Sequence, residues 1–263
     1  MHLGFENKSA LVTAASRGLG FAVARELLRE GARVMLSSSN AGNLEQAASE
    51  LKRDGLTSFA TFAADLGNHE QIEHLVAATV EKLGGVDLLF TNCGGPPAGA
   101  SLELTDAQWQ RGFETILLSV VRLCRLCVPH MTKRGGGAIL ALTSSTVKQP
   151  IPNLTLSNAL RPAIVGFCKT LSNEVASKNI RVNVIAPGRI LTARTQELDE
   201  AFAARSGKSI GEIRDASVRE IPAARLGAVE EFASVAAFLL SERASYITGQ
   251  ILQIDGGLVK GMW

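Results

Sequence analysis

The first 30 residues contain the feature that most restricts the fold of this chain, a strand, a glycine-containing turn and a helix in direct succession. Residues 9–13 form an apolar run typical of a buried strand, and residues 21–30 have the apolar spacing of an amphipathic helix. Gly18 and Gly20 lie between them and allow backbone N–H groups to approach a phosphate closely. In this context, the turn over residues 13–20 indicates a site for the pyrophosphate of a dinucleotide; the alternative is a purely structural turn.

The rest of the chain repeats the alternation of short apolar runs and longer stretches of helical period. This pattern predicts a parallel sheet with helices on both faces. The chain has 263 residues, of which 46% are hydrophobic, and no Pro/Ser-rich linker divides it. We therefore predict one α/β domain over residues 1–263, with a doubly wound, seven-stranded parallel sheet. The expected strands are residues 8–13, 32–37, 57–63, 86–91, 137–143, 180–186 and 250–255.

Residues 193–220 depart from this alternation because they are polar and charged, and Gly207 and Gly211 interrupt their helical pattern. Two interpretations remain open. The segment is either a mobile flap over a substrate cleft or a solvated pair of surface helices.

The charge pattern and the cysteines exclude several classes of partner. The 27 Lys and Arg residues against 25 Asp and Glu are scattered along the chain, so we expect no nucleic-acid partner. No apolar run approaches the roughly 20 residues of a membrane span, and residues 1–8 lack a signal-peptide layout, so we expect a cytoplasmic protein without a membrane partner. Cys124 and Cys127 have no second ligand pair; we expect no metal site and interpret them as one face of a buried helix.

The end of the second predicted strand favours NADP(H) over NAD(H). Proteins that bind NAD usually place an acidic residue there to bind the ribose diol. This chain has serines at that point, Ser38 and Ser39 included, which leave room for a 2′-phosphate. Arg17 in the turn is a candidate partner for that phosphate, and a solvated loop charge is the alternative for it.

Several motifs agree in order and spacing with one family along nearly the whole chain. Residues 13–20 resemble T-G-x-x-x-G-x-G with Ala14 in place of the first glycine, and residues 92–94 resemble N-A-G. Residues 183–188 read N-V-I-A-P-G, and residues 255–257 read D-G-G. The chain thus resembles the short-chain dehydrogenase/reductase family, most closely its β-ketoacyl carrier-protein reductase-like branch. The resemblance implies a Rossmann fold, a small-molecule substrate, and a homo-oligomer, either a tetramer or a dimer.

The turn, the serines and the resemblance together give a set of candidate cofactor-binding residues. They are Thr13, Ser16, Arg17, Gly18, Leu19, Gly20, Ser38, Ser39, Asp65, Leu66, Asn92, Cys93, Gly94, Arg161, Pro187, Gly188, Ile190 and Thr192.

The catalytic tetrad of the family, Asn, Ser, Tyr and Lys, is retained at one position only. Ser144 matches the serine, 13 residues before position 157, with Ser145 as the second choice. Alignment places Ser157 at the tyrosine, Arg161 at the lysine and Ile116 at the asparagine. We take Ser144, Ser157 and Arg161 as the candidate catalytic residues.

These replacements change the available proton chemistry. A phenol near a cation donates a proton to a carbonyl oxygen, whereas an aliphatic hydroxyl is less acidic and shorter. Arginine binds ribose but stays protonated. Pro162 disfavours helical geometry at Arg161, so we expect a kinked or late-starting helix with Ser157 as an alternative N-cap and Arg161 as an alternative surface charge. By position, Lys148 is a candidate replacement donor.

Three functions fit these observations. The first is an NADP(H)-dependent oxidoreductase acting on a carbonyl or alcohol, with a ketoacyl compound as one candidate substrate and a modified proton pathway. The second is a catalytically weak or inactive nucleotide-binding sensor or assembly subunit. The third is an enzyme whose chemistry needs no phenol.

Overall fold

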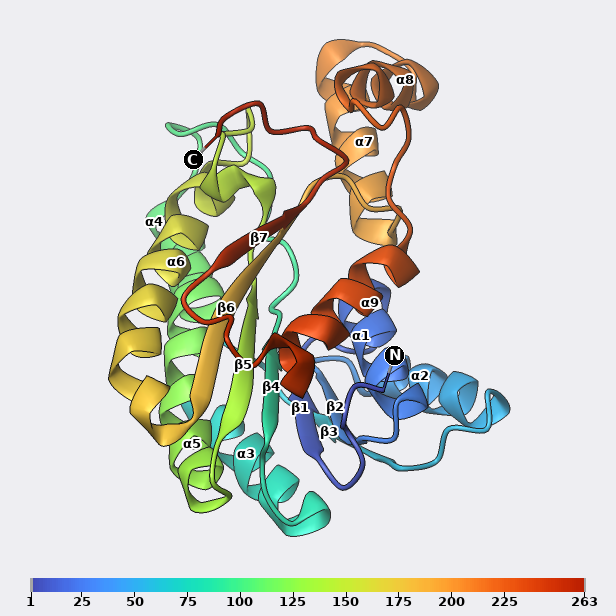
Figure 1. Ribbon diagram of the computed structural model, residues 1–263. Helices are drawn as coiled ribbons and strands as arrows, with labels where there is room; N and C mark the ends of the chain where they lie inside the picture. Colours follow the sequence, from blue (N-terminus) through green and yellow to red (C-terminus); the bar gives the residue numbers. More distant parts are fainter. Residues whose placement is uncertain (1, 263) are drawn as a thin grey trace.

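The structure, a computed structural model, describes residues 2–262 and contains one seven-stranded sheet (Figure 1). The strand order is β3-β2-β1-β4-β5-β6-β7, and every neighbouring pair is parallel. This confirms the predicted doubly wound α/β fold, with strand ends that differ from the predicted ends by a few residues. The strands are β1 Ser9–Val12, β2 Arg33–Ser38, β3 Phe59–Ala63, β4 Leu88–Thr91, β5 Gly137–Leu142, β6 Ile180–Pro187 and β7 Ile251–Ile254.

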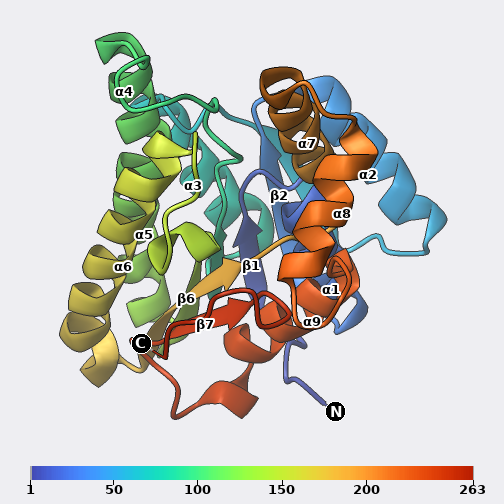
Figure 2. The ribbon, with the colours of Figure 1, turned by 90° about the horizontal axis from the view of Figure 1, so that it is seen from above.

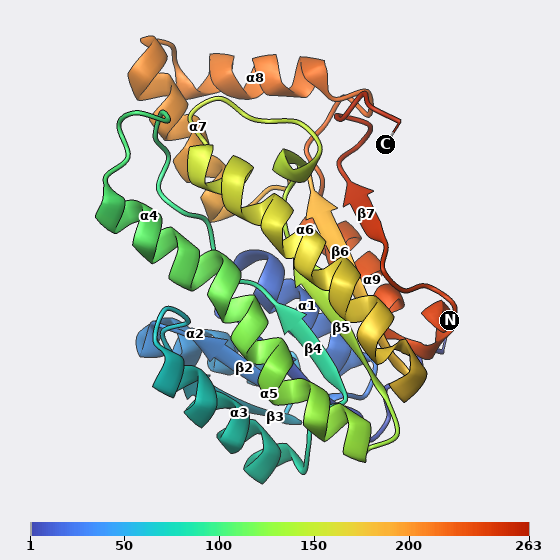
Figure 3. The same ribbon diagram turned by 90° about the vertical axis from the view of Figure 1, so that its left-hand side faces the viewer.

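Helices cover both faces of the sheet and bury one hydrophobic core on each (Figures 1 and 3). Helices α1, α2 and α9 pack on one face, and α3, α5 and α6 on the other, as the apolar runs of the strands require. The helices are α1 Gly18–Arg29, α2 Ala41–Arg53, α3 His69–Leu83, α4 Asp106–Gly112, α5 Ser119–Lys133, α6 Thr155–Val175, α7 Ala193–Ser206, α8 Ile210–Glu220 and α9 Val229–Leu240. A π-helical turn, Phe113–Leu118, joins α4 to α5.

The order of the strands places a crevice where β1 meets β4. Here the chain runs outward in both directions, and ligands of doubly wound folds bind at the carboxyl ends of such strands. Hydrogen bonds tie the two strand ends together: Thr13 donates its backbone N–H to the Phe90 carbonyl at 3.1 Å and its hydroxyl to the Asn92 carbonyl at 2.7 Å. The glycine-containing turn therefore leaves β1 at the crevice.

Residues 193–220 form the two helices α7 and α8, which are joined through Gly207 in a left-handed conformation. Ser209 and Glu212 make a capping box that starts α8. Figure 2, which shows the molecule from above, places both helices on the side of the sheet where α1, α2 and α9 lie. The mobility of this segment stays a prediction.

The helical face that carries Cys124 and Cys127 is buried, as the sequence predicted. Burial raises the pKa of Cys127 to about 12 and raises the pKa of Cys124 well above its usual value. Within residues 2–262, no group of three His, Cys, Asp or Glu side chains is arranged to hold a metal ion. No helix in the same range is long and apolar enough to span a membrane.

Candidate functional site

The turn after β1 has the backbone geometry of a phosphate-binding loop. Gly18 has φ +59°, a value that favours glycine, and Gly20 packs where a Cβ atom would collide with the backbone of Ala14. Ala14, which stands where the related motif has glycine, also has a left-handed φ of +46° and so carries strain of roughly 1–2 kcal/mol. Arg17 precedes α1 without a side-chain cap, so the first N–H groups of α1 are left for a ligand.

The adenosine end of the predicted site is built from hydroxyl groups and a helix start. Ser16 donates a hydrogen bond to the hydroxyl of Ser38 at 3.0 Å, and the backbone N–H of Asn40 donates to the same hydroxyl at 3.4 Å. Asn40 caps α2, while Ser39 is exposed beside it. Hydroxyls next to a helix N-terminus suit a phosphate, and none of the residues from Ser37 to Asn40 is acidic.

Arg17 is 68% exposed, and its Nη2 atom lies 3.6 Å from Oε1 of Glu197 on α7. An exposed ion pair of this kind contributes at most about 1 kcal/mol. Arg17 is therefore free to exchange this partner for an anion.

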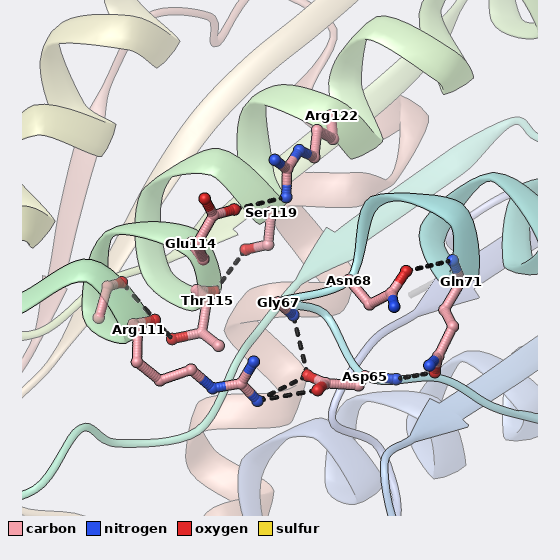
Figure 4. Close-up of polar contacts among 10 residues, drawn as sticks. Asp65, Gly67, Asn68, Gln71, Arg111, Glu114, Thr115, Ser119 and Arg122 are labelled. Atoms are coloured by element: carbon pink, nitrogen blue, oxygen red, sulfur yellow. Dashed lines mark hydrogen bonds and ion pairs between the residues drawn. The ribbon is translucent and has the colours of Figure 1, made fainter. Parts of the chain in front are cut away.

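Asp65 is held by an arginine that the sequence reading did not find (Figure 4). Its carboxylate accepts two hydrogen bonds from Nη2 of Arg111 on α4, at 2.8 and 3.0 Å, and one from the backbone N–H of Gly67. The bond to Arg111 lowers the pKa of Asp65, with the Gly67 N–H acting in the same direction against partial burial. Neighbouring Leu66 packs instead into the core beneath α3 and α5.

The segment after β4 is hydrogen-bonded to the turn that follows β1. The backbone N–H of Asn92 donates to the Thr13 hydroxyl at 2.9 Å, and its side-chain amide donates to the Ala14 carbonyl at 3.4 Å. The Asn92 side-chain oxygen also accepts from the Gly94 N–H. Cys93 between them is partly exposed. Asn92 thus joins two strand ends across the crevice.

The end of β6 supplies the opposite wall. Pro187 is the last residue of β6, and the N–H of Gly188 donates to the Ile254 carbonyl at 2.9 Å. A Cβ atom on Gly188 would press against Asp255, which explains the glycine. Ile190 is buried, and Thr192 caps α7 through the Thr195 N–H.

Ser144 lies two residues after the end of β5 and accepts a hydrogen bond from the Thr146 N–H at 3.2 Å. Its side chain and that of buried Ser145 both line the large cavity described below. The structure therefore leaves both serines as candidates at the cavity wall.

Ser157 is buried and does not line that cavity. Its hydroxyl lies 3.1 Å from the hydroxyl of Thr146 and accepts from Nε of Arg161 at 3.2 Å. Helix α6 begins at Thr155, after Leu154 as N-cap, so the expectations of a late helix start and of a Ser157 N-cap are wrong. Burial of Leu156 and other apolar side chains of this helix outweighs the backbone hydrogen bond that Pro162 removes.

Arg161 is buried and joins two strand ends rather than lying on the surface, so the alternative of a surface charge is wrong. Its Nη1 atom donates to the carbonyls of Leu142 and Thr143 at 3.2 and 3.1 Å, and Nη2 donates to the Gly94 carbonyl at 3.1 Å. Burial lowers the pKa of this guanidinium, because the charged form loses its hydration. Carbonyl dipoles hold this cation in place.

Ile116 is buried in the π-helical turn between α4 and α5. π-Helical turns occur frequently at functional sites, and this one lies where the family motif keeps its asparagine. The apolar side chain packs into the core and offers no polar group to the cleft.

A cavity of about 800 Å³ opens beside Ser144 and Gly188. Its walls come from the β5–α6 connection, the flap helices α7 and α8, and residues 258–260 near the C-terminus. The apolar lining includes Pro150, Ile151, Leu154, Leu198, Phe202, Ile213, Leu258 and Val259, and the charged lining is Arg189, Arg205, Glu220 and Lys260. Lys148 lies outside this lining, so its position gives no support to a role as proton donor.

Comparison with known proteins agrees with this geometry. Residues 13–259 match the family profile described as Enoyl-(Acyl carrier protein) reductase. "Dehydrogenase/reductase SDR family member 4" of Bos taurus is 37% identical over 254 residues, 96% of this chain and 87% of that protein. The "3-oxoacyl-[acyl-carrier-protein] reductase FabG" of Chlamydia muridarum is 34% identical over 253 residues, 96% of this chain and 97% of that protein.

A solved structure of similar shape is L-sorbose reductase from Gluconobacter frateurii in complex with NADPH and L-sorbose. Its TM-score is 0.94 at 33% identity, and the match covers all of both chains. A switch-point crevice with a glycine-containing turn defines this chain as an oxidoreductase of the nicotinamide-nucleotide-binding type. The chain belongs to the short-chain dehydrogenase/reductase family, in the branch that resembles the β-ketoacyl carrier-protein reductases.

Proposed function

We propose that the protein is an NADP(H)-dependent oxidoreductase that moves a hydride between the cofactor and a carbonyl or alcohol substrate. The observation that carries this proposal is that the glycine-containing turn after β1 and the 800 Å³ cavity, whose wall contains Ser144 and Gly188, both lie at the carboxyl edge of the parallel sheet. When bound, the nicotinamide ring would supply the hydride. A ketoacyl compound is one candidate substrate, and a cytoplasmic homodimer or homotetramer is the candidate assembly.

The residues present fit the cofactor at both ends of the cleft. Free N–H groups at the start of α1 suit the pyrophosphate, and Ser16, Ser38 and the start of α2 suit a 2′-phosphate. Ser144 reaches the cavity and would orient the substrate oxygen. Because the Ser157 hydroxyl is buried, proton exchange with the substrate would pass through Ser144 and water. Arg161 would stabilise the position of the Ser157 hydroxyl through its hydrogen bond.

One observation favours a second function, a nucleotide-binding sensor or assembly subunit without catalysis. The Ser157 hydroxyl is engaged with both Thr146 and Arg161, so it has no free route to a substrate. A sensor needs the cofactor cleft but no proton donor.

A paired titration separates the two functions. We expect NADPH to bind more tightly than NADH in a fluorescence titration, and the wild type to reduce at least one member of a carbonyl panel. The double variant Ser157→Tyr/Arg161→Lys, which restores the family residues, is assayed beside it. Nucleotide binding without turnover in the wild type, with turnover in the double variant, would establish the sensor. Failure of both nucleotides to bind would overturn both functions.

Arg17→Gln tests the preference for NADP(H). Loss of one charge-assisted bond to a 2′-phosphate is worth about 1.4 kcal/mol, so we expect the Kd for NADPH to rise about tenfold while the Kd for NADH stays nearly unchanged. Arg29→Gln, at the exposed far end of α1, is the matched control. An equal loss for both nucleotides in Arg17→Gln would show that Arg17 does not read the 2′-phosphate.

A further inference from the structure

Arg189 follows Gly188 at the end of β6 and lines the same cavity as Ser144. Its side chain is 19% exposed, so most of the guanidinium is shielded from bulk water. Arg189 is thus a mostly buried cation at the wall of the cavity.

Asp199 of α7 holds Arg189 in this place. The Asp199 side chain is fully buried, and its Oδ1 accepts a hydrogen bond from Nη2 of Arg189. Nε of Arg214 on α8 lies 3.7 Å from the other oxygen, Oδ2. Among the described residues neither arginine makes an ion pair with a second acid, so two cations share one carboxylate. The cavity lining itself has three cations, Arg189, Arg205 and Lys260, against one acid, Glu220, so its net charge is positive.

The Nε–H of Arg189 is buried and donates to no acceptor in the described part of the chain. Buried donors in proteins nearly always have a partner. Glu220, the one acid of the lining, makes no hydrogen bond or ion pair with Arg189 among the described residues. This Nε atom is enclosed and so does not contact a ligand in the cavity, and the Asp199 carboxylate that binds the same guanidinium has an oxygen without a hydrogen-bond partner, Oδ2. The positive charge of the lining is what favours an anionic oxygen from the ligand.

We propose that Arg189 binds an anionic oxygen group of the substrate, so that the substrate class is an oxo acid or hydroxy acid with a hydrocarbon portion. The planar guanidinium fork suits a carboxylate, and the apolar side chains of the cavity suit the hydrocarbon portion. Asp199 is the positioning residue that prevents Arg189 from turning away. This inference rests on the proposed function and narrows its substrate.

Matched ligands test the inference. The probes are 2-, 4- and 5-oxohexanoate and their methyl esters, which differ in charge but have the same carbon chain up to the carboxyl group. Binding is followed at equilibrium through tryptophan fluorescence in the presence of NADP⁺, which has no hydride to give to an oxo acid, and turnover with NADPH is followed separately. We expect at least one acid to bind the wild type tenfold or more tightly than its ester. In Arg189→Gln, we expect a tenfold or larger loss for that acid, with the ester and NADPH unchanged.

Two further variants guard against a structural explanation. Arg219→Gln, on the exposed side of α8, should keep the preference for the acid, and Arg189→Lys should restore part of it. Equal binding of every acid and its ester, or an equal loss of both in Arg189→Gln, would overturn the inference. The proposed function would still stand if NADPH binds and an ester is reduced. Failure of NADPH itself to bind the wild type would overturn the proposed function and the inference with it.

Discussion

Gly20→Ala is expected to weaken NADPH binding by about 100-fold or more. A methyl group at this position would collide with the carbonyl of Ala14 and the Cα of Ala15, which are backbone atoms and cannot rotate away. Moving α1 to make room costs about 1–3 kcal/mol and shifts its N-terminal N–H groups away from the phosphate. Each loss of about 1.4 kcal/mol of binding free energy weakens the affinity tenfold, so twice this loss weakens it 100-fold. Fluorescence titration measures the affinity, and thermal unfolding measures the stability.

Gly166→Ala is the matched control for this substitution. Gly166 lies on the exposed side of α6, and an added Cβ there meets no atom within 4 Å. Alanine in a helix interior is favoured over glycine by about 1 kcal/mol, so this variant should unfold at an equal or higher temperature and bind NADPH normally. Normal NADPH binding by Gly20→Ala would place the nucleotide elsewhere.

Asp199→Ala is expected to loosen the flap helices without unfolding the sheet. Removing one partner of a buried ion pair typically costs about 3–5 kcal/mol, because the remaining charge stays buried and unpaired. Arg214 is 41% exposed and can turn toward water, so the lower end of this range is expected. The cost falls on α7 and α8, whose amide hydrogens should exchange faster while those of β1 and β4 stay protected.

Glu200→Ala controls for a change on the same helix. Glu200 is exposed next to Asp199 and makes its polar contact with Gln196 of the same helix. Its removal should leave the exchange of residues 193–220 unchanged. Slower or unchanged exchange in Asp199→Ala would mean that packing of α7, and not the buried carboxylate, holds the flap.

The sequence was sufficient to predict the sheet and the glycine-containing turn between β1 and α1, because both are encoded in short local patterns. Val, Ile, Leu and Ala runs define strands buried on both faces, and Gly18 and Gly20 mark the one turn where a phosphate fits. The serines after β2 are likewise adjacent in the chain, and their neighbourhood with Ser16 follows from the parallel pairing of β1 and β2.

Contacts between segments that are distant in the sequence could not be predicted from such local patterns. Nothing near Asp65 in the sequence points to Arg111, which lies 46 residues further on and reaches it only through the packing of α4. Pro162 predicted a disrupted helix at Ser157, yet tertiary burial keeps α6 helical from Thr155 onward. The pair of Arg189 and Asp199 was missed for a related reason, since a charged residue in a polar segment gives no local sign of being buried.

The four cysteine thiols differ in their exposure to solvent. Cys124, Cys127 and Cys168 are enclosed in the core under α5 and α6, where they are inaccessible and strongly protonated. Cys93 alone is partly exposed, and it lies at the end of β4 between Asn92 and Gly94. Burial raises the pKa of this thiol as well, and it donates a hydrogen bond to the Gly94 carbonyl, so thiol reagents should react slowly with the folded, unmodified protein and, among the four cysteines, at Cys93 first.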